Sequence, residues 1–124
     1  MRIDAFHELP ALARQRIWDG ITSRNVHGER MTLGVVELDP DAVAPEHSHP
    51  HEQFGVVLSG SVLFRIGDET KELRPGSVYV IPANAPHTAQ AGPGGTVLID
   101  VFSPVREEWQ AAPAADDAEP RWPS

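Results

Sequence analysis

The sequence predicts an all-β domain, either a sandwich or a barrel, and two observations lead to this prediction. From Met31 onward, short apolar runs recur and are separated by glycine, proline, aspartate and asparagine, a pattern typical of sandwiches and barrels. No segment after residue 22 has a convincing helical period. The length of 124 residues suits one domain with a single core.

The expected strands follow from the apolar runs and from the turns between them. Gly60 ends one run, Gly67-Asp68 makes a hairpin turn, and the stretch 92–95 makes another turn. The strands that we expect are residues 31–38, 54–58, 62–66, 70–73, 78–81 and 96–102.

The two ends of the chain differ from this central domain, which we place at residues 23–109. Residues 1–22 mix charged and apolar positions and are expected to form a strap, with Trp18 as a packing anchor over the barrel rim. Residues 110–124 are rich in proline, alanine and acids, which cannot form a core. We expect this acidic tail to be disordered or to lie on a partner subunit, with Trp122 as its one residue able to dock.

Composition excludes several classes of function. The chain has no cysteine, so disulfides, zinc-thiolate sites and cysteine nucleophiles are excluded. The net charge is −8 and no basic patch with interleaved aromatic residues occurs, which argues against nucleic-acid binding. No run approaches the roughly 20 apolar residues of a membrane span, and the segment 1–10 lacks the apolar stretch of a signal peptide. A cytoplasmic protein is therefore expected.

Three of the six histidines fall within five residues, at His47, His49 and His51. On a strand these side chains and Gln53 would share one face, where His87, which follows a Pro-Ala-Asn-Ala-Pro bend, could join them. By itself the cluster leaves a defined metal site and a nonspecific sticky patch equally open. His51 is interpreted as a pocket wall or a support for the ligands, because four ligands from one strand rarely reach one ion.

The last expected strand carries an acid within an apolar run. Asp100 there is costly unless it is paired or used in chemistry. Phe102 shares its face, and Arg106 follows a Ser-Pro bend from which it could fold back over the mouth of the barrel. An Asp100–Arg106 ion pair that closes the barrel and a catalytic role are equally compatible with this spacing.

Two segments together resemble the paired motifs of the cupin superfamily. The first runs from Pro45 through His47, His49 and Gln53 to Gly60, and the second runs from Gly76 to His87. The resemblance implies a double-stranded β-helix, often a homodimer, that holds one divalent metal ion inside its mouth. The ligands that it implies are His47, His49, Gln53 and His87, and the ion could be nickel, manganese, iron, zinc or cobalt.

Two positions depart from the usual motifs. Asn84 stands where glycine is usual, a mild change because asparagine also tolerates a left-handed turn. Gln53 replaces the usual acidic ligand. Three imidazoles and an amide leave the charge of the ion unneutralised, which favours polyol or carboxylate substrates over dioxygenase chemistry.

The string from His47 to Gln53 and the stretch from Asp100 to Trp109 resemble the small pectin-degradation cupins of the KdgF type. That resemblance implies promotion of the conversion of 4,5-unsaturated monouronates, acidic sugars from pectin or alginate, to linear keto acids. Asp100, Phe102 and Arg106 match the functional positions of that group on the last strand.

Two other classes of function stay open. One is a different enzyme on the same barrel, a metal-dependent dioxygenase or a sugar-phosphate isomerase, and oxygen consumption with bound iron would favour the dioxygenase. The other is a non-catalytic module that binds a small acid and releases it unchanged.

Overall fold

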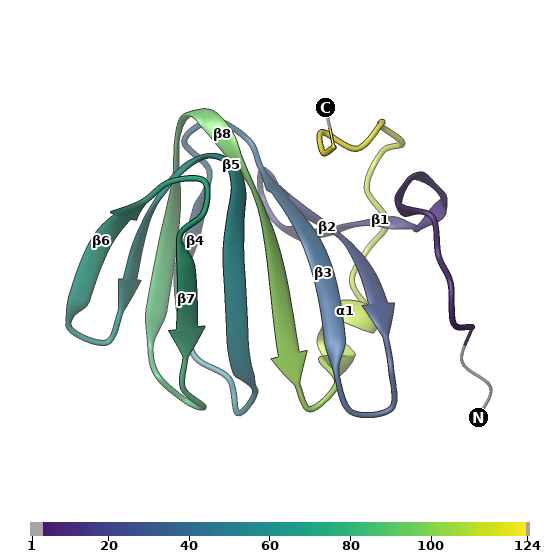
Figure 1. Ribbon diagram of the computed structural model, residues 1–124, viewed down its shortest axis with the longest axis horizontal. Coiled ribbons are helices and arrows are strands. Elements are labelled where there is room, and N and C mark those ends of the chain that lie inside the picture. Colours follow the sequence, from purple (N-terminus) through teal and green to yellow (C-terminus); the bar gives the residue numbers. More distant parts are fainter. Residues whose placement is uncertain (1–3, 124) are drawn as a thin grey trace.

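The computed structural model describes residues 4–123 and is built almost entirely of β-strands (Figure 1). All pairings between its named strands are antiparallel. The predicted all-β class is confirmed, and the four-residue helix α1 is an addition that the missing helical period did not predict. In chain order the elements are the 3-10 helix Leu9–Ala11, β1 Arg14–Trp18, β2 Ile21–His27, β3 Thr32–Leu38, β4 Val43–His47, β5 Glu52–Ile66, β6 Glu69–Leu73, β7 Val78–Ile81, β8 His87–Ser103 and α1 Glu107–Gln110.

The long strands β5 and β8 pair with each other and belong to two sheets at once. Near one end of this pair, β8 also pairs with β3, and β5 pairs with β7. Together with β1 and β2 these strands form what we call the first sheet. Toward the other end β8 pairs with β4, and β5 pairs with β6, which gives the second sheet. The inward faces of the two sheets enclose the core.

Two glycines allow β5 and β8 to pass from one sheet to the other. Gly60 and Gly95 have φ angles of 76° and 80°, in the left-handed region that favours glycine. A Cβ atom on Gly60 would lie 2.0 Å from the carbonyl oxygen of Gly95. The strand end predicted at Gly60 and the turn predicted at 92–95 are both wrong, because these residues bend continuous strands and shift their register.

Alternate side chains along each strand point inward, and these side chains form the core. Three of them, Val57, Val62 and Ile81, are completely or almost completely buried. Phe64 packs against Tyr79 with ring centroids 4.6 Å apart. The predicted hairpin formed by residues 62–66 and 70–73 is confirmed, since Val62 pairs with Leu73.

Residues of the predicted strap form β1 and the start of β2 at the edge of the first sheet. Trp18, at the end of β1, is half-buried, and its ring centroid lies 4.6 Å from that of His47. Residues 1–3 of the strap and residue 124 of the tail lie outside the described residues. The boundaries 1–22, 23–109 and 110–124 stay a prediction.

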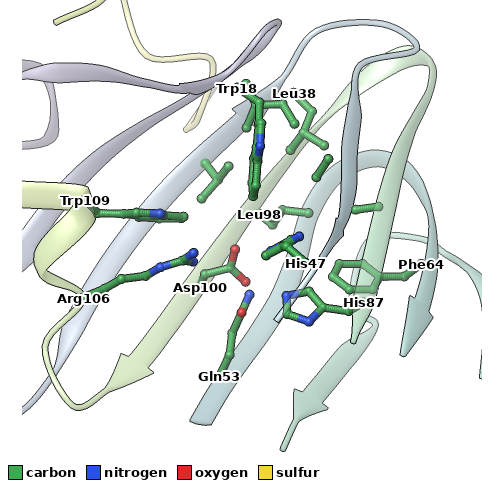
Figure 2. A pocket seen from close by; sticks show the side chains of 14 residues that line it. Trp18, Leu38, His47, Gln53, Phe64, His87, Leu98, Asp100, Arg106 and Trp109 are labelled. Carbon is green, nitrogen blue, oxygen red and sulfur yellow. The ribbon is translucent and has the colours of Figure 1, made fainter. Parts of the chain in front are cut away.

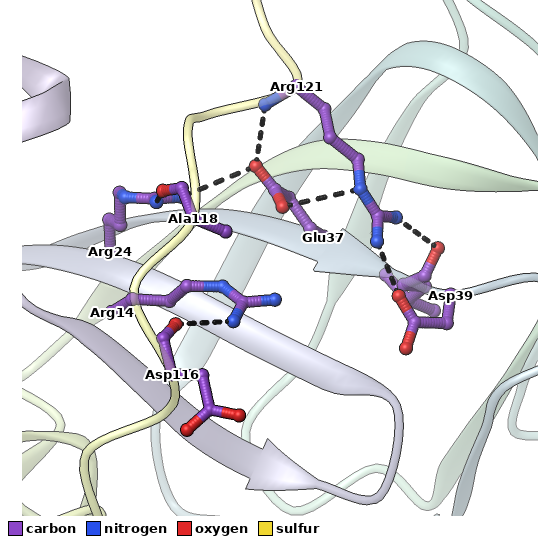
Figure 3. A network of polar contacts seen from close by, with 8 residues as sticks. Arg14, Arg24, Glu37, Asp39, Asp116, Ala118 and Arg121 are labelled. Carbon is purple, nitrogen blue, oxygen red and sulfur yellow. Dashed lines mark hydrogen bonds and ion pairs between the residues drawn. The ribbon is translucent and has the colours of Figure 1, made fainter.

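The acidic tail differs from the expected disorder, because it lies against β1 and crosses the first sheet of its own chain (Figure 3). The backbone of Ala114 bridges to Gln15, and the guanidinium of Arg24 donates to the carbonyl of Ala118. Glu37 accepts a hydrogen bond from the backbone N–H of Arg121 at 2.9 Å. Backbone pairing and ion pairs thus order a segment whose composition offers little apolar area.

No helix in the described part of the chain is long and apolar enough to cross a membrane.

The tail contact predicts a specific loss of stability. Glu37 is 3% exposed and forms ion pairs with both Arg24 and Arg121. We expect Glu37→Gln to lower the free energy of unfolding by about 3 kcal/mol, because it leaves the buried Arg24 without its counter-charge. Urea unfolding followed by circular dichroism measures this. Glu72→Gln, in the exposed pair with Arg74, is the control and should change stability by less than about 1 kcal/mol. Equal effects of the two substitutions would contradict the interpretation.

Candidate metal and substrate site

The histidines of the cluster come from three different elements. His47 ends β4, His87 begins β8, and the two residues pair in register. His49 and His51 lie in the loop between β4 and β5, so the expectation of a single strand through residues 47–53 is wrong. Pro50 interrupts the strand, since it has no backbone N–H to donate to a neighbour. The loop nonetheless brings His49 to the other two histidines.

Three imidazoles converge on one point. The ligand nitrogens of His47, His49 and His87 all lie within 4.8 Å of one another. Each ring is oriented by its Nδ1 atom, which hydrogen-bonds a backbone carbonyl: Pro45 at 2.7 Å, His51 at 3.0 Å and Ala85 at 2.9 Å, respectively. An Nδ1–H that donates to a carbonyl leaves Nε2 with a free lone pair, the arrangement typical of metal-binding histidines.

The Nε2 atoms fit a cation. Nε2 of His87 is buried and has no hydrogen-bond partner among the described residues. Nε2 of His49 lies 3.0 Å from Oε1 of Gln53, and two acceptors at that distance are favourable only if a positive charge lies between them. The residues present therefore fit a divalent ion held by three imidazole nitrogens and one amide oxygen.

The orientation of Gln53 is set by Asp100. The two side chains are hydrogen-bonded, and this bond favours the charged carboxylate, as an amide N–H that donates to it would. That bond turns Oε1 of Gln53 toward the histidines. The hydroxyl of Tyr79 also donates to Asp100, so the carboxylate is held by two donors. Tyr79 was not anticipated from the sequence, although its position two residues before the inward-facing Ile81 could have placed it inside.

Two glycines make room around Asp100. Gly34 of β3 and Gly55 of β5 pair with Asp100 from either side. A Cβ atom on Gly55 would lie 2.1 Å from Cζ of Tyr79, and one on Gly34 would lie 2.9 Å from the ring of Trp109. The absence of side chains at these positions lets both aromatic rings approach the carboxylate.

Burial shifts the pKa values of the site in a direction that suits metal binding. Desolvation lowers the pKa of His47 and His49 below 6.5 and that of His87 to about 4. All three rings are therefore neutral near pH 7. Desolvation also raises the pKa of Asp100 to about 6, against the opposing effect of its hydrogen bonds.

Arg106 folds back over the barrel mouth, as the sequence predicted. Its Cζ atom lies 4.7 Å from the ring centroid of Phe102 and 4.6 Å from that of Trp109. Its Nε donates to Glu108 at 2.7 Å. Among the described residues its ion-pair partner is Glu108 and not Asp100, so the structure does not form the barrel-closing pair that the spacing allowed.

Phe102 and His51 support the site from behind. Phe102 is completely buried and packs edge-on against His49 and Trp109, a placement that favours packing over stacking on a sugar. His51 is buried, accepts from the His49 ring through its carbonyl, and packs near Phe102. This matches the supporting position expected for His51.

A cavity of about 40 Å³ opens between the two sheets (Figure 2). Its polar lining consists of His47, Gln53, His87, Asp100 and Arg106, with Trp18 and Trp109 beside them. A shallower groove of about 350 Å³ is lined by the same two tryptophans and Arg106, and residues 111–113 of the tail form part of its wall. The predicted site residues thus meet in one hollow, with Phe102 and His49 just behind its lining.

This fold and site are those of a cupin. Residues 34–102 match the family described as Cupin domain, and the chain belongs to that family. It is 29% identical, over 97 residues, to the pectin degradation protein KdgF of Dickeya dadantii, a match that covers 77% of this chain and 88% of the relative.

Solved structures agree with this assignment. KdgF from Halomonas sp. superposes with a TM-score of 0.78 at 30% identity and covers 85% of this chain and 97% of its own. An RmlC-like cupin from Shewanella frigidimarina superposes with a TM-score of 0.80 at 25% identity and covers 86% of this chain and 96% of its own. The predicted jelly-roll barrel and the resemblance to small KdgF-type cupins are confirmed.

The site geometry predicts how metal binding responds to pH. Protons compete with the ion for Nε2, but burial lowers the pKa of all three rings, that of His87 to about 4. We expect the affinity for nickel or manganese, measured by isothermal titration calorimetry, to change less than about threefold between pH 7.5 and 6.5 and to fall steeply below about pH 5. His49→Ala should abolish binding, whereas His7→Ala, at an exposed position, should not. A tenfold loss of affinity already at pH 6.5 would contradict the assignment.

Proposed function

We propose that this cupin is a metal-dependent enzyme that converts 4,5-unsaturated monouronates to linear keto acids. The observation that carries the proposal is the meeting of three kinds of group in one cavity. These are the converging Nε2 atoms of the histidines, the carboxyl of Asp100 and the guanidinium of Arg106. The similarity to KdgF proteins over most of the chain supports this choice of substrate.

We propose His47, His49, Gln53 and His87 as the ligands of a divalent ion, which could be nickel, manganese, iron, zinc or cobalt. When bound, such an ion supplies a Lewis acid that can hold and polarise substrate oxygens. The protein contributes the orientation of the ligands through backbone carbonyls and through Asp100.

The sizes of the two hollows support a substrate position at the mouth. A cavity of about 40 Å³ holds a few water molecules, whereas the groove of about 350 Å³ is near the lower end of the range of small-molecule sites. The sugar ring therefore lies in the groove between Trp18 and Trp109 and directs its polar edge inward. Arg106 lines both the cavity and the groove. Its planar guanidinium binds the uronate carboxylate.

Asp100 is the group that transfers a proton to the substrate. The unsaturated ring contains an enol ether conjugated to the carboxylate. When the hemiacetal at C1 opens, the C1–O bond breaks and the ring oxygen stays on C5 as an enol. A proton delivered to C4 and the loss of the enol proton then give the C5 ketone, so the reaction is an isomerisation. Asp100 is the one carboxyl among the described lining residues of the cavity, and a pKa of about 6 suits donation near neutral pH.

The direct test follows the ultraviolet absorbance of the conjugated double bond of unsaturated galacturonate released by a pectin lyase. Metal-loaded protein should accelerate its loss over the spontaneous rate, and metal-stripped protein should not. No acceleration by protein with bound metal would contradict the proposal. It would favour a dioxygenase or isomerase on the same barrel, or a non-catalytic module that binds a small acid.

Two substitutions should separate the proposed roles. Asp100→Asn should lower kcat about 10²- to 10⁴-fold while metal content, measured by plasma mass spectrometry, stays close to one ion per chain. Arg106→Lys keeps the charge but loses the planar fork, so it should raise KM about tenfold with a smaller change in kcat. Lys71→Ala, an exposed cation on β6, is the matched control and should change neither constant. Full turnover by Asp100→Asn would eliminate the proton-transfer role.

A further inference from the structure

Arg106 is held in place by three independent contacts within its own chain. Its backbone N–H donates to Oγ1 of Thr32 at 2.9 Å, and Thr32 is completely buried. Its Nε donates to Oε1 of Glu108 at 2.7 Å. Its Cζ atom lies over the rings of Phe102 and Trp109. A side chain that is flexible when exposed is therefore fixed at its backbone, at its Nε and on the faces of its guanidinium.

The turn that follows β8 makes these contacts possible. The backbone N–H of Trp109 donates to the carbonyl of Arg106 at 3.1 Å and closes the turn. Arg106 itself precedes α1, with φ and ψ angles of −88° and 88°, which are not helical. Side chains two residues apart within a helix do not face each other. The contact between Arg106 and Glu108 therefore depends on the non-helical backbone of Arg106.

The guanidinium of Arg106 has donors that no neighbour in the described chain uses. Between residues 4 and 123, its acceptor is Glu108, which takes one of the five N–H donors of the side chain. The donors on its two terminal nitrogens are bound to none of these residues. Figure 2 shows the guanidinium directed from the edge of the cavity toward Asp100. Two parallel N–H groups match the two oxygens of one carboxylate, so this edge suits an acidic ligand.

Glu108 approaches the guanidinium from the solvent side. Its side chain is 54% exposed, whereas that of Arg106 is 7% exposed. Glu108 lines the groove at the mouth but does not line the cavity. A ligand carboxylate at the cavity and the carboxylate of Glu108 would therefore contact different edges of one guanidinium. An ion pair with so exposed a partner adds little to stability, so the value of this contact lies in the orientation that it gives to Arg106.

We propose that Glu108 is a positioning residue for substrate recognition, which fixes Arg106 so that its terminal N–H groups meet a free carboxylate at the cavity. This inference rests on the proposed function and names the feature that the site selects: an ionised carboxylate, in preference to its ester or to a neutral sugar. Fixing the guanidinium before the substrate arrives removes the loss of side-chain freedom from the binding step. Without Glu108, the guanidinium is free to turn away from the cavity, and two simultaneous hydrogen bonds to the carboxylate form less often.

Steady-state kinetics of the metal-loaded protein with the unsaturated uronate and with its methyl ester test the proposal. The wild type should prefer the free acid by about 10²-fold in kcat/KM, because the ester cannot accept two charge-assisted hydrogen bonds. Glu108→Ala should raise KM for the acid about tenfold and leave the kinetics of the ester unchanged, so the preference for the acid falls. Glu108→Gln keeps an acceptor for Nε and should lie between the two. A purely structural role of Glu108 would lower the activity toward both substrates alike.

Glu107→Ala is the matched control, because it removes the same charge from the neighbouring exposed residue of α1. It should keep the wild-type KM and the wild-type preference for the free acid. Two results with Glu108→Ala would overturn the proposal. A lower KM for the acid would mean that Glu108 repels the substrate carboxylate, and an unchanged preference for the acid over the ester would mean that the ion pair has no part in recognition.

A binding measurement separates this proposal from the proposed function. Galacturonate, a saturated uronate without the reacting double bond, is titrated calorimetrically into the metal-loaded protein. Binding that weakens about tenfold in Glu108→Ala but not in Glu107→Ala supports the positioning role, even if the protein does not convert the unsaturated sugar. Conversion that is equally efficient in Glu108→Ala and the wild type leaves the proposed function standing and eliminates the positioning role. A wild type that neither binds galacturonate nor converts the unsaturated sugar would overturn both proposals.

Discussion

Three backbone carbonyls fix the chemistry of this barrel. The carbonyl groups of Pro45, His51 and Ala85 each hydrogen-bond the Nδ1 atom of an imidazole, and by doing so they choose the tautomer whose Nε2 lone pair points inward. Strands β4 and β8, together with the loop that carries His49, bring the ligand nitrogens within 4.8 Å of one another, in surroundings that disfavour protonation. Neutral acceptors pressed together without a donor cost free energy. A cation relieves that cost, so this arrangement of acceptors fits a metal ion.

The position of Asp100 depends on a second constraint, the pairing of its strand with two glycines. Gly34 and Gly55 flank it in register, and the space above them is filled by Trp109 and Tyr79. The carboxylate is then held by Tyr79 and by the Gln53 amide. A single acid therefore has two tasks: it orients the amide of Gln53, and it provides a carboxyl of raised pKa at the cavity wall.

Periodicity predicted the fold class, and the paired motifs predicted that His47, His49 and His87 meet, because these features depend on local sequence and on an established motif pair. The sequence did not predict that β5 and β8 continue through Gly60 and Gly95. Glycine adopts a left-handed backbone both in turns and in bent strands, so its presence does not distinguish the two. Tyr79 was missed because its contact with Asp100 depends on the register of strands far apart in the chain. Disorder was an expectation for the tail because its composition offers little apolar area to bury. Hydrogen bonds from Arg14 and Arg24 to its carbonyls, which hold it in place, leave no such signal.

The groove at the mouth connects these local features to the size of the substrate. Trp18 comes from the N-terminal edge strand, Arg106 and Trp109 follow the last strand, and residues 111–113 of the tail complete the wall. The parts of the chain outside the two metal motifs thus build the surface that meets the substrate, while the motifs build the site behind it. In the proposed function, a cavity of about 40 Å³ admits only the polar edge of the sugar ring, so discrimination among acids would fall to this groove. Changes confined to these end segments would then alter the choice of substrate while the residues of the histidine cluster stay in place.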